Sequence, residues 1–499
     1  MPSYFTASQL ADPSLFVTSG YVGGEWLALS EGDKKFEVRD PATRAVIATL
    51  PDFGVAEARN AIDAAYAAQK EWAAKTGKER ATVLRRLYDL MIANQTDLAA
   101  ILTAEMGKPL TEAKGEIQYG ASYVEWFAEE AKRIYGDIIP GHQTDKRIIV
   151  IKQPVGVVAS ITPWNFPNAM MTRKLAPALA VGCAFVLKPA AETPLSALAI
   201  AKLAEEAGLP KGLFSVIPST DARVIGQEFC SNDKVRKLSF TGSTEVGRIL
   251  MRQSADKVMK TSMELGGNAP FIVFDDADLD AAVEGAMISK YRNNGQTCVC
   301  ANRIYVQASV YDAFAQKLTT AVQAMKVGNG FEAGVNAGPL ISMEALAKVE
   351  DHVADARAKG ASIVTGGKRH ALGGTFYEPT VLTEVTKSMK VAREETFGPI
   401  APLFKFETVD EVIEQANDTI FGLASYFYAK DMSRVWRVAE ALEYGMVGVN
   451  TGQISTEVAP FGGIKQSGQG REGSKYGCSD YLEIKYICMG GIGNGYEGP

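Results

Sequence analysis

The sequence contains few histidines. His142, His352 and His370 are the only three, and they lie far apart in a chain of 499 residues. A metal site usually needs several imidazole, thiolate or carboxylate ligands at short spacing, and a Ser-His-Asp triad needs a histidine beside its serine. We therefore expect no bound metal, and we expect acid–base chemistry to depend on carboxylates or cysteine.

Cysteine and long apolar runs are also scarce. Six cysteines are too few for a disulfide scaffold in a chain of this length, which favours a reducing compartment. No apolar stretch of membrane-spanning length occurs, and the first residues resemble neither a signal peptide nor a transit peptide. These absences predict a cytoplasmic protein that has no membrane partner.

The charge is weakly acidic and carries no basic cluster. The formal net charge is −6, and lysine and arginine are scattered along the chain, which argues against nucleic acid as a partner. Apolar residues make up 46% and charged residues 22%, the balance of an ordinary globular protein. A chain of this length is expected to divide into two or three domains.

Apolar runs alternate with helical patterns from about Lys152 onward, after a start that reads as short antiparallel strands and two helices. Repeated strand–helix units predict an α/β fold with a doubly wound parallel sheet. Ligands bind such sheets beyond the carboxyl ends of the strands. The residues that follow the predicted strands, and so mark an expected nucleotide site, are Trp164, Asn165, Lys188, Ser219, Thr241, Gly242 and Ser243.

Two apolar extended segments, "RIIVIKQ" from Arg147 and "YLEIKYICM" from Tyr481, stand apart from this alternation. We expect them to pair and to present a sheet edge that another subunit completes. The motif "GNGYEG" at Gly493 to Gly498 satisfies G-x-G-x-x-G, but no helix can follow it to hold a pyrophosphate. We interpret it as a tail.

Three residues have neighbours that suit catalysis. Glu264 precedes a Gly-Gly pair, where the backbone can turn tightly and a ligand can approach. Cys298 lies in the polar turn "NNGQTC", where a thiol can act as a nucleophile, and Asn165 lies between prolines at a strand end, where its amide can donate to an oxyanion. The alternatives are a surface or capping glutamate, a buried cysteine and an ordinary proline-rich turn.

Seven motifs together resemble the aldehyde dehydrogenase superfamily in order and spacing over nearly the whole chain: "ITPWNFP", "VLKPAAETP", "FTGSTEVG", "MELGGNAPFIV", "NNGQTCVC", "EETFGPI" and "PFGGIKQSGQGRE". The resemblance implies a Rossmann-type cofactor domain, an α/β catalytic domain and a small β oligomerisation element. The expected bounds are residues 1–131 and 152–261, residues 262–465, and residues 132–151 with 480–499, respectively. A homo-oligomer, either a dimer or a tetramer, is expected.

The same resemblance assigns roles to residues. Cys298 is expected to be the nucleophile, Glu264 the general base, and Asn165 with the Cys298 backbone N–H the oxyanion hole. NAD+ or NADP+ is expected to accept a hydride, and the residues implied to hold the cofactor are Trp164, Lys188, Thr241, Gly242, Ser243, Glu395 and Phe397. Ala191 stands where many relatives have a glutamate that repels a 2'-phosphate, so NADP+ is expected to serve as well as NAD+ or better.

Two arginines suggest the substrate. Arg173 and Arg292 occupy positions where many relatives have an aromatic residue, and a guanidinium beside a substrate tunnel is suited to bind a carboxylate. With Ser455, they resemble the branch of the family that oxidises succinate semialdehyde; glutarate semialdehyde, one methylene longer, remains an alternative substrate. Cys300 resembles the second cysteine of a redox pair and predicts reversible oxidation with Cys298; the alternative is a bystander thiol that packs under the loop.

Two other classes of function compete with this reading. A thiol acyl-transferase or esterase can use the same cysteine and glutamate, and the cofactor motifs argue against it. A structural, crystallin-like protein on this fold needs none of the three candidate catalytic residues, so their joint presence argues against that class. A change in nicotinamide absorbance on adding an aldehyde separates the dehydrogenase from both.

Overall fold

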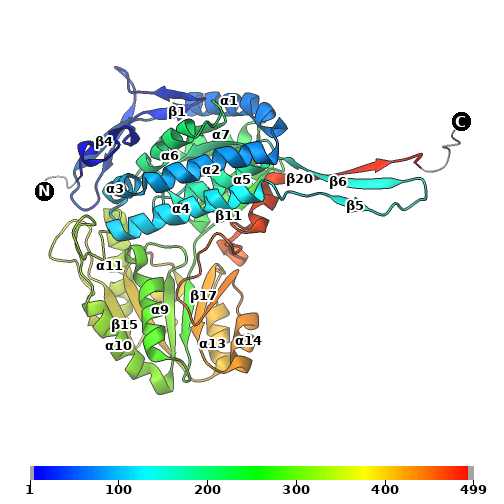
Figure 1. Ribbon diagram of the computed structural model, residues 1–499. Helices are drawn as coiled ribbons and strands as arrows, with labels where there is room; N and C mark the ends of the chain where they lie inside the picture. Colours follow the sequence, from blue (N-terminus) through cyan, green and yellow to red (C-terminus); the bar gives the residue numbers. More distant parts are fainter. Residues whose placement is uncertain (1–4, 493–499) are drawn as a thin grey trace, which may run out of the picture.

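A computed structural model describes residues 5–492, so residues 1–4 and 493–499, including the "GNGYEG" tail and the outer ends of two predicted domains, lie outside it. Figure 1 shows two α/β bodies, one above the other, and a narrow arm that projects from the side. Each body is built on its own sheet. The predicted division into domains remains a prediction, and the molecule is described below by its sheets.

The upper body contains an eight-stranded sheet in the order β19-β11-β10-β7-β8-β9-β1-β2. Its five central strands are parallel, as the alternating pattern predicts, while β1, β2 and β19 pair antiparallel at the ends. The bounds are β1 Gly20–Val22, β2 Glu25–Leu27, β7 Val157–Ile161, β8 Ala184–Lys188, β9 Phe214–Val216, β10 Val235–Thr241, β11 Lys260–Glu264 and β19 Gly468–Gln469. The antiparallel start is completed by β3 Lys35–Arg39 and β4 Val46–Pro51, which pair with each other.

Strand β7 is the point at which the order of this sheet reverses. It pairs with β8 on one side and with β10 on the other, so that Ile161 faces both Lys188 and Phe240. The chain leaves β7 and β10 toward helices on different sides of the sheet, which opens a crevice at their carboxyl ends. Trp164 and Asn165 follow β7, and Thr241 ends β10, so the predicted residues do lie at this crevice.

Helices cover both faces of the upper sheet (Figure 1). They are α1 Val55–Ala74, α2 Gly77–Ala93, α3 Gln95–Met106, α4 Leu110–Glu130, α5 Ala169–Val181, α6 Leu195–Glu206, α7 Ala222–Ser231 and α8 Thr244–Ala255. Their apolar sides and the central strands form one large buried core. None of the helices between residues 5 and 492 is long and apolar enough to cross a membrane.

The lower body contains a seven-stranded sheet in the order β14-β15-β16-β13-β12-β17-β18. Separate apolar cores pack on it. Its strands are β12 Ala269–Val273, β13 Ala301–Gln307, β14 Ser362–Thr365, β15 Thr380–Thr383, β16 Ile400–Phe406, β17 Ala424–Tyr428 and β18 Met446–Val449, and its helices are α9 Leu279–Tyr291, α10 Tyr311–Gln323, α11 Met343–Ala358, α12 Lys390–Arg393, α13 Val409–Asn417 and α14 Met432–Ala441.

The turn that carries Cys298 connects α9 to β13. Asp278 caps the start of α9 by accepting hydrogen bonds from the backbone of Asp280 and Ala281. After the helix, Asn293 and Asn294 adopt left-handed backbone conformations, which asparagine tolerates better than most residues. They reverse the chain and direct it toward the other body, so that Cys298 reaches the crevice.

The arm is a three-stranded antiparallel sheet of β5 Asp137–Ile139, β6 Arg147–Pro154 and β20 Leu482–Met489. Strand β20 pairs with β6 along its whole length, from Leu482 opposite Pro154 to Met489 opposite Arg147. The predicted pairing of these two segments is confirmed. Past Leu482, the side chains of β20 are exposed, and the strand forms an edge of the sheet.

Helices α4 and α5 approach each other closely at Gly120. A methyl group there would lie 2.1 Å from Asn168 Oδ1 and 3.0 Å from Thr172 Oγ1, whereas a methyl group at Gly115 on the same helix would meet nothing within 4 Å. We expect Gly120→Ala to lower the midpoint of thermal unfolding, because overpacking costs about 1–3 kcal/mol. Gly115→Ala is expected to maintain or raise the midpoint, because alanine favours a helix by about 1 kcal/mol. Equal effects of the two substitutions would contradict this close packing.

Candidate active site

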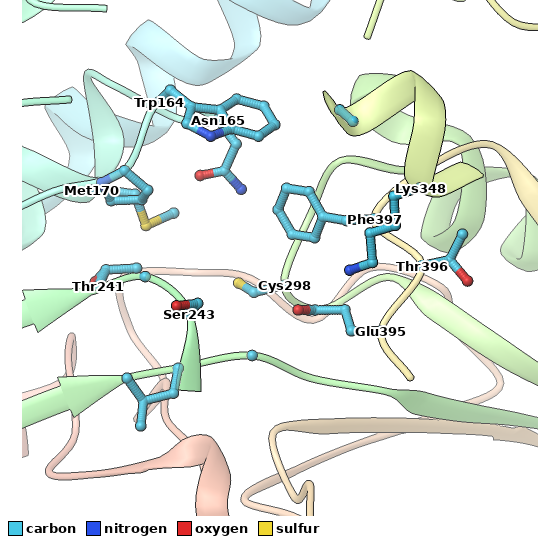
Figure 2. A pocket seen from close by; sticks show the side chains of 15 residues that line it. Trp164, Asn165, Met170, Thr241, Ser243, Cys298, Lys348, Glu395, Thr396 and Phe397 are labelled. Atoms are coloured by element: carbon cyan, nitrogen blue, oxygen red, sulfur yellow. The ribbon is translucent and has the colours of Figure 1, made fainter. Parts of the chain in front are cut away.

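A cavity of about 290 Å³ lies at the crevice between the two bodies (Figure 2). Its wall brings together residues far apart in the sequence, from the turn after β7, from the start of α8, from the Cys298 loop and from the segment after α12. Eight of the residues singled out in the sequence line it: Trp164, Asn165, Thr241, Gly242, Ser243, Cys298, Glu395 and Phe397.

Asn165 is held by the loop that carries Cys298. Its Nδ2 donates a hydrogen bond to the Gln296 carbonyl at 3.1 Å, and an amide nitrogen carries a second hydrogen. Figure 2 shows the amide of Asn165 and the sulfur of Cys298 in the same cavity. Among the described residues, none accepts the backbone N–H of Cys298. These two N–H groups therefore form a suitable pair of donors for an oxyanion.

The Cys298 thiol is protonated in this site at neutral pH. Burial raises its pKa to about 12, and the charges of Glu264 and Glu395 act in the same direction. The guanidinium groups of Arg173 and Arg292 lower the pKa but do not cancel the effect of burial. A nucleophilic thiolate therefore requires a nearby group to accept its proton.

Glu264 is the last residue of β11 and is 2% exposed. It does not line the cavity, and neither of its carboxylate oxygens has a hydrogen-bond partner among the described residues. Burial and the neighbouring Glu472 raise the pKa of this carboxyl group, and Arg173 and Lys174 lower it, with a net result of about 8. A carboxylate with such a pKa is an effective general base near neutral pH.

One side of the cavity suits a nicotinamide cofactor. Glu395 accepts a hydrogen bond from the Gly267 backbone at 2.9 Å, and the rings of Phe397 and Trp164 meet edge to face at 5.5 Å. Thr241 Oγ1 is buried and has no hydrogen-bond partner, so a polar ligand can satisfy it. The residues at this end fit a dinucleotide, because α8 begins here with Ser243 as its N-cap and presents backbone N–H groups to a phosphate.

Lys188 and Ala191 lie away from this cavity. Lys188 is almost buried, its Nζ donates to the Pro189 carbonyl at 3.0 Å, and Glu192, Asp52 and Asp221 are the carboxylates that offset its charge. Ala191 lines a separate cavity of about 340 Å³ together with Glu192 and Thr220. Lys188 ends β8 and Ala191 follows it, next to the switch point, so a dinucleotide must extend beyond the first cavity to reach them.

Lys348, on α11, also lines the cavity and was not found from the sequence. It lowers the pKa of Glu395, which burial raises to about 7. Helix α11 has an ordinary amphipathic pattern, and no motif distinguishes this lysine from those on the solvent side. Met170, Ala345 and Thr396 were missed in the same way.

A third and much smaller cavity, of about 10 Å³, lies beside the Cys298 loop and is lined by Arg292 and Ser455, together with Thr297 and Val299. The guanidinium of Arg292 packs over the ring of Phe166, with its Cζ 5.2 Å from the ring centre. It forms no ion pair with a carboxylate in residues 5–492, although its charge lowers the pKa of the nearby Glu112, which burial raises. A partly buried guanidinium without an ion-pair partner is suited to receive an anion.

Arg173 has a different environment. It lies on α5, is fully buried, forms an ion pair with Glu472 and packs on the ring of Phe461 at 4.3 Å. Its Nη1 and Nη2 have no hydrogen-bond partner among the described residues, and it does not line the cavity of Arg292. Its charge lowers the pKa of Cys298, which shows that it acts on the site electrostatically.

Cys300 is fully buried beneath the loop. Its Sγ donates to the Lys290 carbonyl at 3.3 Å and receives a hydrogen bond from Lys290 Nζ at 3.3 Å. Both Cys298 and Cys300 are free thiols. A disulfide between residues two apart needs the loop to rearrange, so the redox role of Cys300 remains a prediction. No cluster of metal ligands occurs in the part of the chain that the structure describes.

The model of the Aldehyde dehydrogenase family matches residues 26–487. The chain belongs to this family. The predicted fold class is confirmed with it, since a crystal structure of succinate-semialdehyde dehydrogenase from Burkholderia pseudomallei superposes with a TM-score of 0.95 at 64% identity, covering 96% of this chain and 99% of that one.

Relatives in the family are named for different substrates. A glutarate-semialdehyde dehydrogenase of Pseudomonas aeruginosa is 66% identical over 484 residues, covering 97% of this chain and 100% of the relative. An NADP(+) succinate-semialdehyde dehydrogenase of Escherichia coli is 62% identical over 482 residues, covering 97% and 100%. The protein is therefore an aldehyde dehydrogenase, and these relatives leave its substrate open between two aldehydes.

The raised pKa of Glu264 predicts the pH dependence of acyl-enzyme hydrolysis. The carboxyl group is protonated below its pKa and can accept a proton only when ionised, so hydrolysis should accelerate as pH rises through about 8. Single-turnover kinetics with a pre-formed acyl-enzyme measure this step. Glu264→Gln should hydrolyse a pre-formed acyl-enzyme slowly and without this pH dependence, whereas an unchanged profile in that variant would exclude Glu264 as the base.

Proposed function

We propose that this protein oxidises succinate semialdehyde to succinate with NADP+ or NAD+. The observation that carries the proposal is Arg292, which lines a small cavity beside the loop that carries Cys298 and has no ion-pair partner among the described residues. Ser455 in the same cavity adds a hydroxyl donor. In an aldehyde with a terminal carboxylate, the carboxylate can pair with Arg292 while the aldehyde carbon meets Cys298.

The reaction begins when the Glu264 carboxylate accepts the thiol proton of Cys298 and the sulfur adds to the aldehyde carbon; Glu264 passes this proton to solvent before the hydrolytic step. The second N–H of Asn165 Nδ2 and the backbone N–H of Cys298 stabilise the oxygen, which becomes an anion. A bound nicotinamide supplies the hydride acceptor for the oxidation. Glu264 then removes a proton from water, which hydrolyses the Cys298 thioester and releases the acid.

Residues of the main cavity are proposed to hold that nicotinamide end. The carboxylate of Glu395, fixed by Gly267, is placed to accept hydrogen bonds from a ribose, and Phe397 and Trp164 bound the space beside it. Ser243 and Gly242 lie where the diphosphate meets the start of α8, and Lys188 is proposed to reach the adenosine ribose.

Glutarate semialdehyde is the second candidate substrate. It differs from succinate semialdehyde by one methylene, which a pocket distinguishes by only about 1–3 kcal/mol. The Pseudomonas relative that is 66% identical supports it, while the Burkholderia and Escherichia relatives support the shorter aldehyde. The same Arg292 site serves both, so the proposed substrate class is an aldehyde with a terminal carboxylate.

The arm supports the proposal of a homo-oligomer, either a dimer or a tetramer. The exposed side chains of β20 include Ile484, Tyr486 and Ile487, and an apolar strand edge of this kind is normally covered. Strand β18, at the end of the lower sheet, is an edge as well. A second copy of this chain is the partner that we propose, in a cytoplasmic protein.

Removal of the Arg292 charge tests the substrate class. Arg292→Ala should raise KM for succinate semialdehyde about 10–100-fold, because a hydrogen bond to a charged group contributes about 1.5–3 kcal/mol. The KM for butyraldehyde, which has the same number of carbons and no carboxylate, should change by less than about 3-fold. Arg173→Ala is likewise expected to raise KM more for succinate semialdehyde than for butyraldehyde.

Equal losses on both aldehydes would reject the proposed role of either arginine. For Arg173, such a result is informative in a second way. Its truncation leaves the buried Glu472 without one of its two cationic partners, so a loss shared by both aldehydes would indicate an electrostatic role near Glu264 and Cys298.

A carboxylate at position 191 tests the cofactor proposal. Ala191→Glu should lower kcat/KM for NADP+ at least about 10-fold and leave kcat/KM for NAD+ nearly unchanged, because the added carboxylate repels the 2'-phosphate that only NADP+ carries. Ala191→Gln, which has nearly the same size and no charge, is the matched control. A similar loss with both cofactors would show that Ala191 does not lie beside the 2' position.

A further inference from the structure

Lys108 is a buried charge that the proposed mechanism does not use. It lies between α3 and α4, its side chain is 1% exposed, and it lines none of the cavities described above. Its Nζ donates to Glu116 Oε2 at 2.5 Å and to the backbone carbonyl of Asn165 at 2.8 Å, and it lies 3.7 Å from the centre of the Phe166 ring. These three neighbours leave the ammonium group no direct path to a substrate.

Glu116 connects the same pair to the start of α5. While its Oε2 holds Lys108, its Oε1 accepts hydrogen bonds from the backbone N–H groups of Asn168 at 3.0 Å and Ala169 at 3.2 Å. The turn from Asn165 to Asn168 is therefore held at both ends by one ion pair. Lys108 holds the Asn165 carbonyl, and Glu116 holds the backbone N–H groups at the start of α5.

The held carbonyl also contacts the nucleophile loop. Asn293 Nδ2 donates to Asn165 O at 3.1 Å and to Gln296 O at 3.1 Å, and Gln296 O is the group that accepts from the Asn165 side chain. The backbone of Asn293 in turn donates to Glu112 Oε2 at 2.7 Å. The backbone carbonyl of Asn165 therefore has fixed contacts from both bodies. Because this backbone is held, the position of the Asn165 amide depends only on its side-chain torsion angles.

We propose that Lys108 and Glu116 form a positioning pair that holds the amide of Asn165 at the oxyanion site. A buried ion pair contributes little net stability, because the cost of removing both charges from water offsets their attraction. Misplacement of a catalytic group by about 1 Å, in contrast, can lower a rate about 100-fold. The inference rests on the proposed role of Asn165 in aldehyde oxidation.

A matched control exists on α3. Glu105 is a fully buried carboxylate that accepts the backbone N–H groups of Leu195 at 2.7 Å and Ser196 at 2.9 Å, at the start of α6. It therefore resembles Glu116 in burial and in its hydrogen bonds to a helix start, but it has no contact with Asn165. Glu105→Gln and Glu116→Gln should both affect stability, and only the second should affect the chemistry.

The test is a double-mutant cycle on the intact enzyme with succinate semialdehyde and NADP+. Lys108→Met should lower kcat about 10–100-fold, with a smaller change in KM, because the oxyanion forms after the substrate binds. In an Asn165→Ala background the same substitution should lower kcat less than about 2-fold, since the group that it positions is absent. Glu116→Gln enters the same cycle if Lys108→Met fails to fold.

A second readout separates positioning from a general loosening of the site. The rate of inactivation by methyl methanethiosulfonate depends on access to the Cys298 thiol and involves no carbonyl oxygen. Lys108→Met and Glu116→Gln should leave this rate within about 2-fold of the parent enzyme, and Glu105→Gln should leave both this rate and kcat within about 3-fold.

The outcomes distinguish this inference from the proposed function. If Asn165→Ala lowers kcat and Lys108→Met lowers it further by its full factor, the positioning role is wrong and the function stands. A loss in Glu105→Gln as large as that in Glu116→Gln would also overturn the positioning role. If Asn165→Ala turns over aldehyde at the parent rate, the oxyanion assignment fails, and the positioning role fails with it.

Discussion

The hydrogen bond from the Asn165 side chain to the Gln296 carbonyl joins the two bodies at the point where chemistry is expected. Asn165 belongs to the turn after β7, in the eight-stranded sheet, and Gln296 belongs to the loop that ends in Cys298, beside the seven-stranded sheet. An oxyanion donor and a nucleophile on separate sheets are useful only if their separation is fixed. This contact, and the groups that support it, set that separation.

Burial of charge is the second constraint on the site. Glu264, Arg173, Lys174 and Glu472 are all less than 5% exposed and lie in one network, in which Glu472 pairs with both cations. Glu264 receives no hydrogen bond there among the described residues, and its raised pKa results from that isolation. A carboxylate that is buried away from water and from hydrogen-bond donors has a raised pKa and can act as a general base, so no histidine is needed.

The sequence was sufficient to predict the residues that occupy regular positions in the fold. Asn165 and Thr241 were found because each lies at the carboxyl end of a strand of a parallel sheet, and the pairing of the arm was found because two isolated segments were extended and apolar. Cys298 and Glu264 were found from their polar or glycine-rich neighbours together with the family motifs. In each of these cases a local pattern carries the information.

Lys108, Glu116 and Lys348 were not predicted, because their roles depend on distant contacts. Lys108 meets the Asn165 carbonyl 57 residues away, and Glu116 meets the start of α5 at 52 and 53 residues. In the sequence, each reads as an ordinary charged residue, because no motif distinguishes it. Likewise, nothing near Arg173 in the sequence indicates Glu472, its partner 299 positions later, since the two meet only when the 3-10 helix η6 Lys475–Tyr481 and the loop before it pack against α5.

The two arginines that suggested the substrate illustrate how structure refines such a prediction. Arg173 and Arg292 are equivalent in the sequence argument, since each replaces an aromatic residue. In the structure, Arg173 is already paired with Glu472, while Arg292 packs on the ring of Phe166, forms no ion pair among the described residues and shares its cavity with Ser455. A neutralised guanidinium attracts a second carboxylate weakly, whereas an unpaired one that is partly desolvated attracts it strongly. Recognition of the substrate carboxylate should therefore depend mainly on Arg292, with Arg173 adding to the field at Cys298.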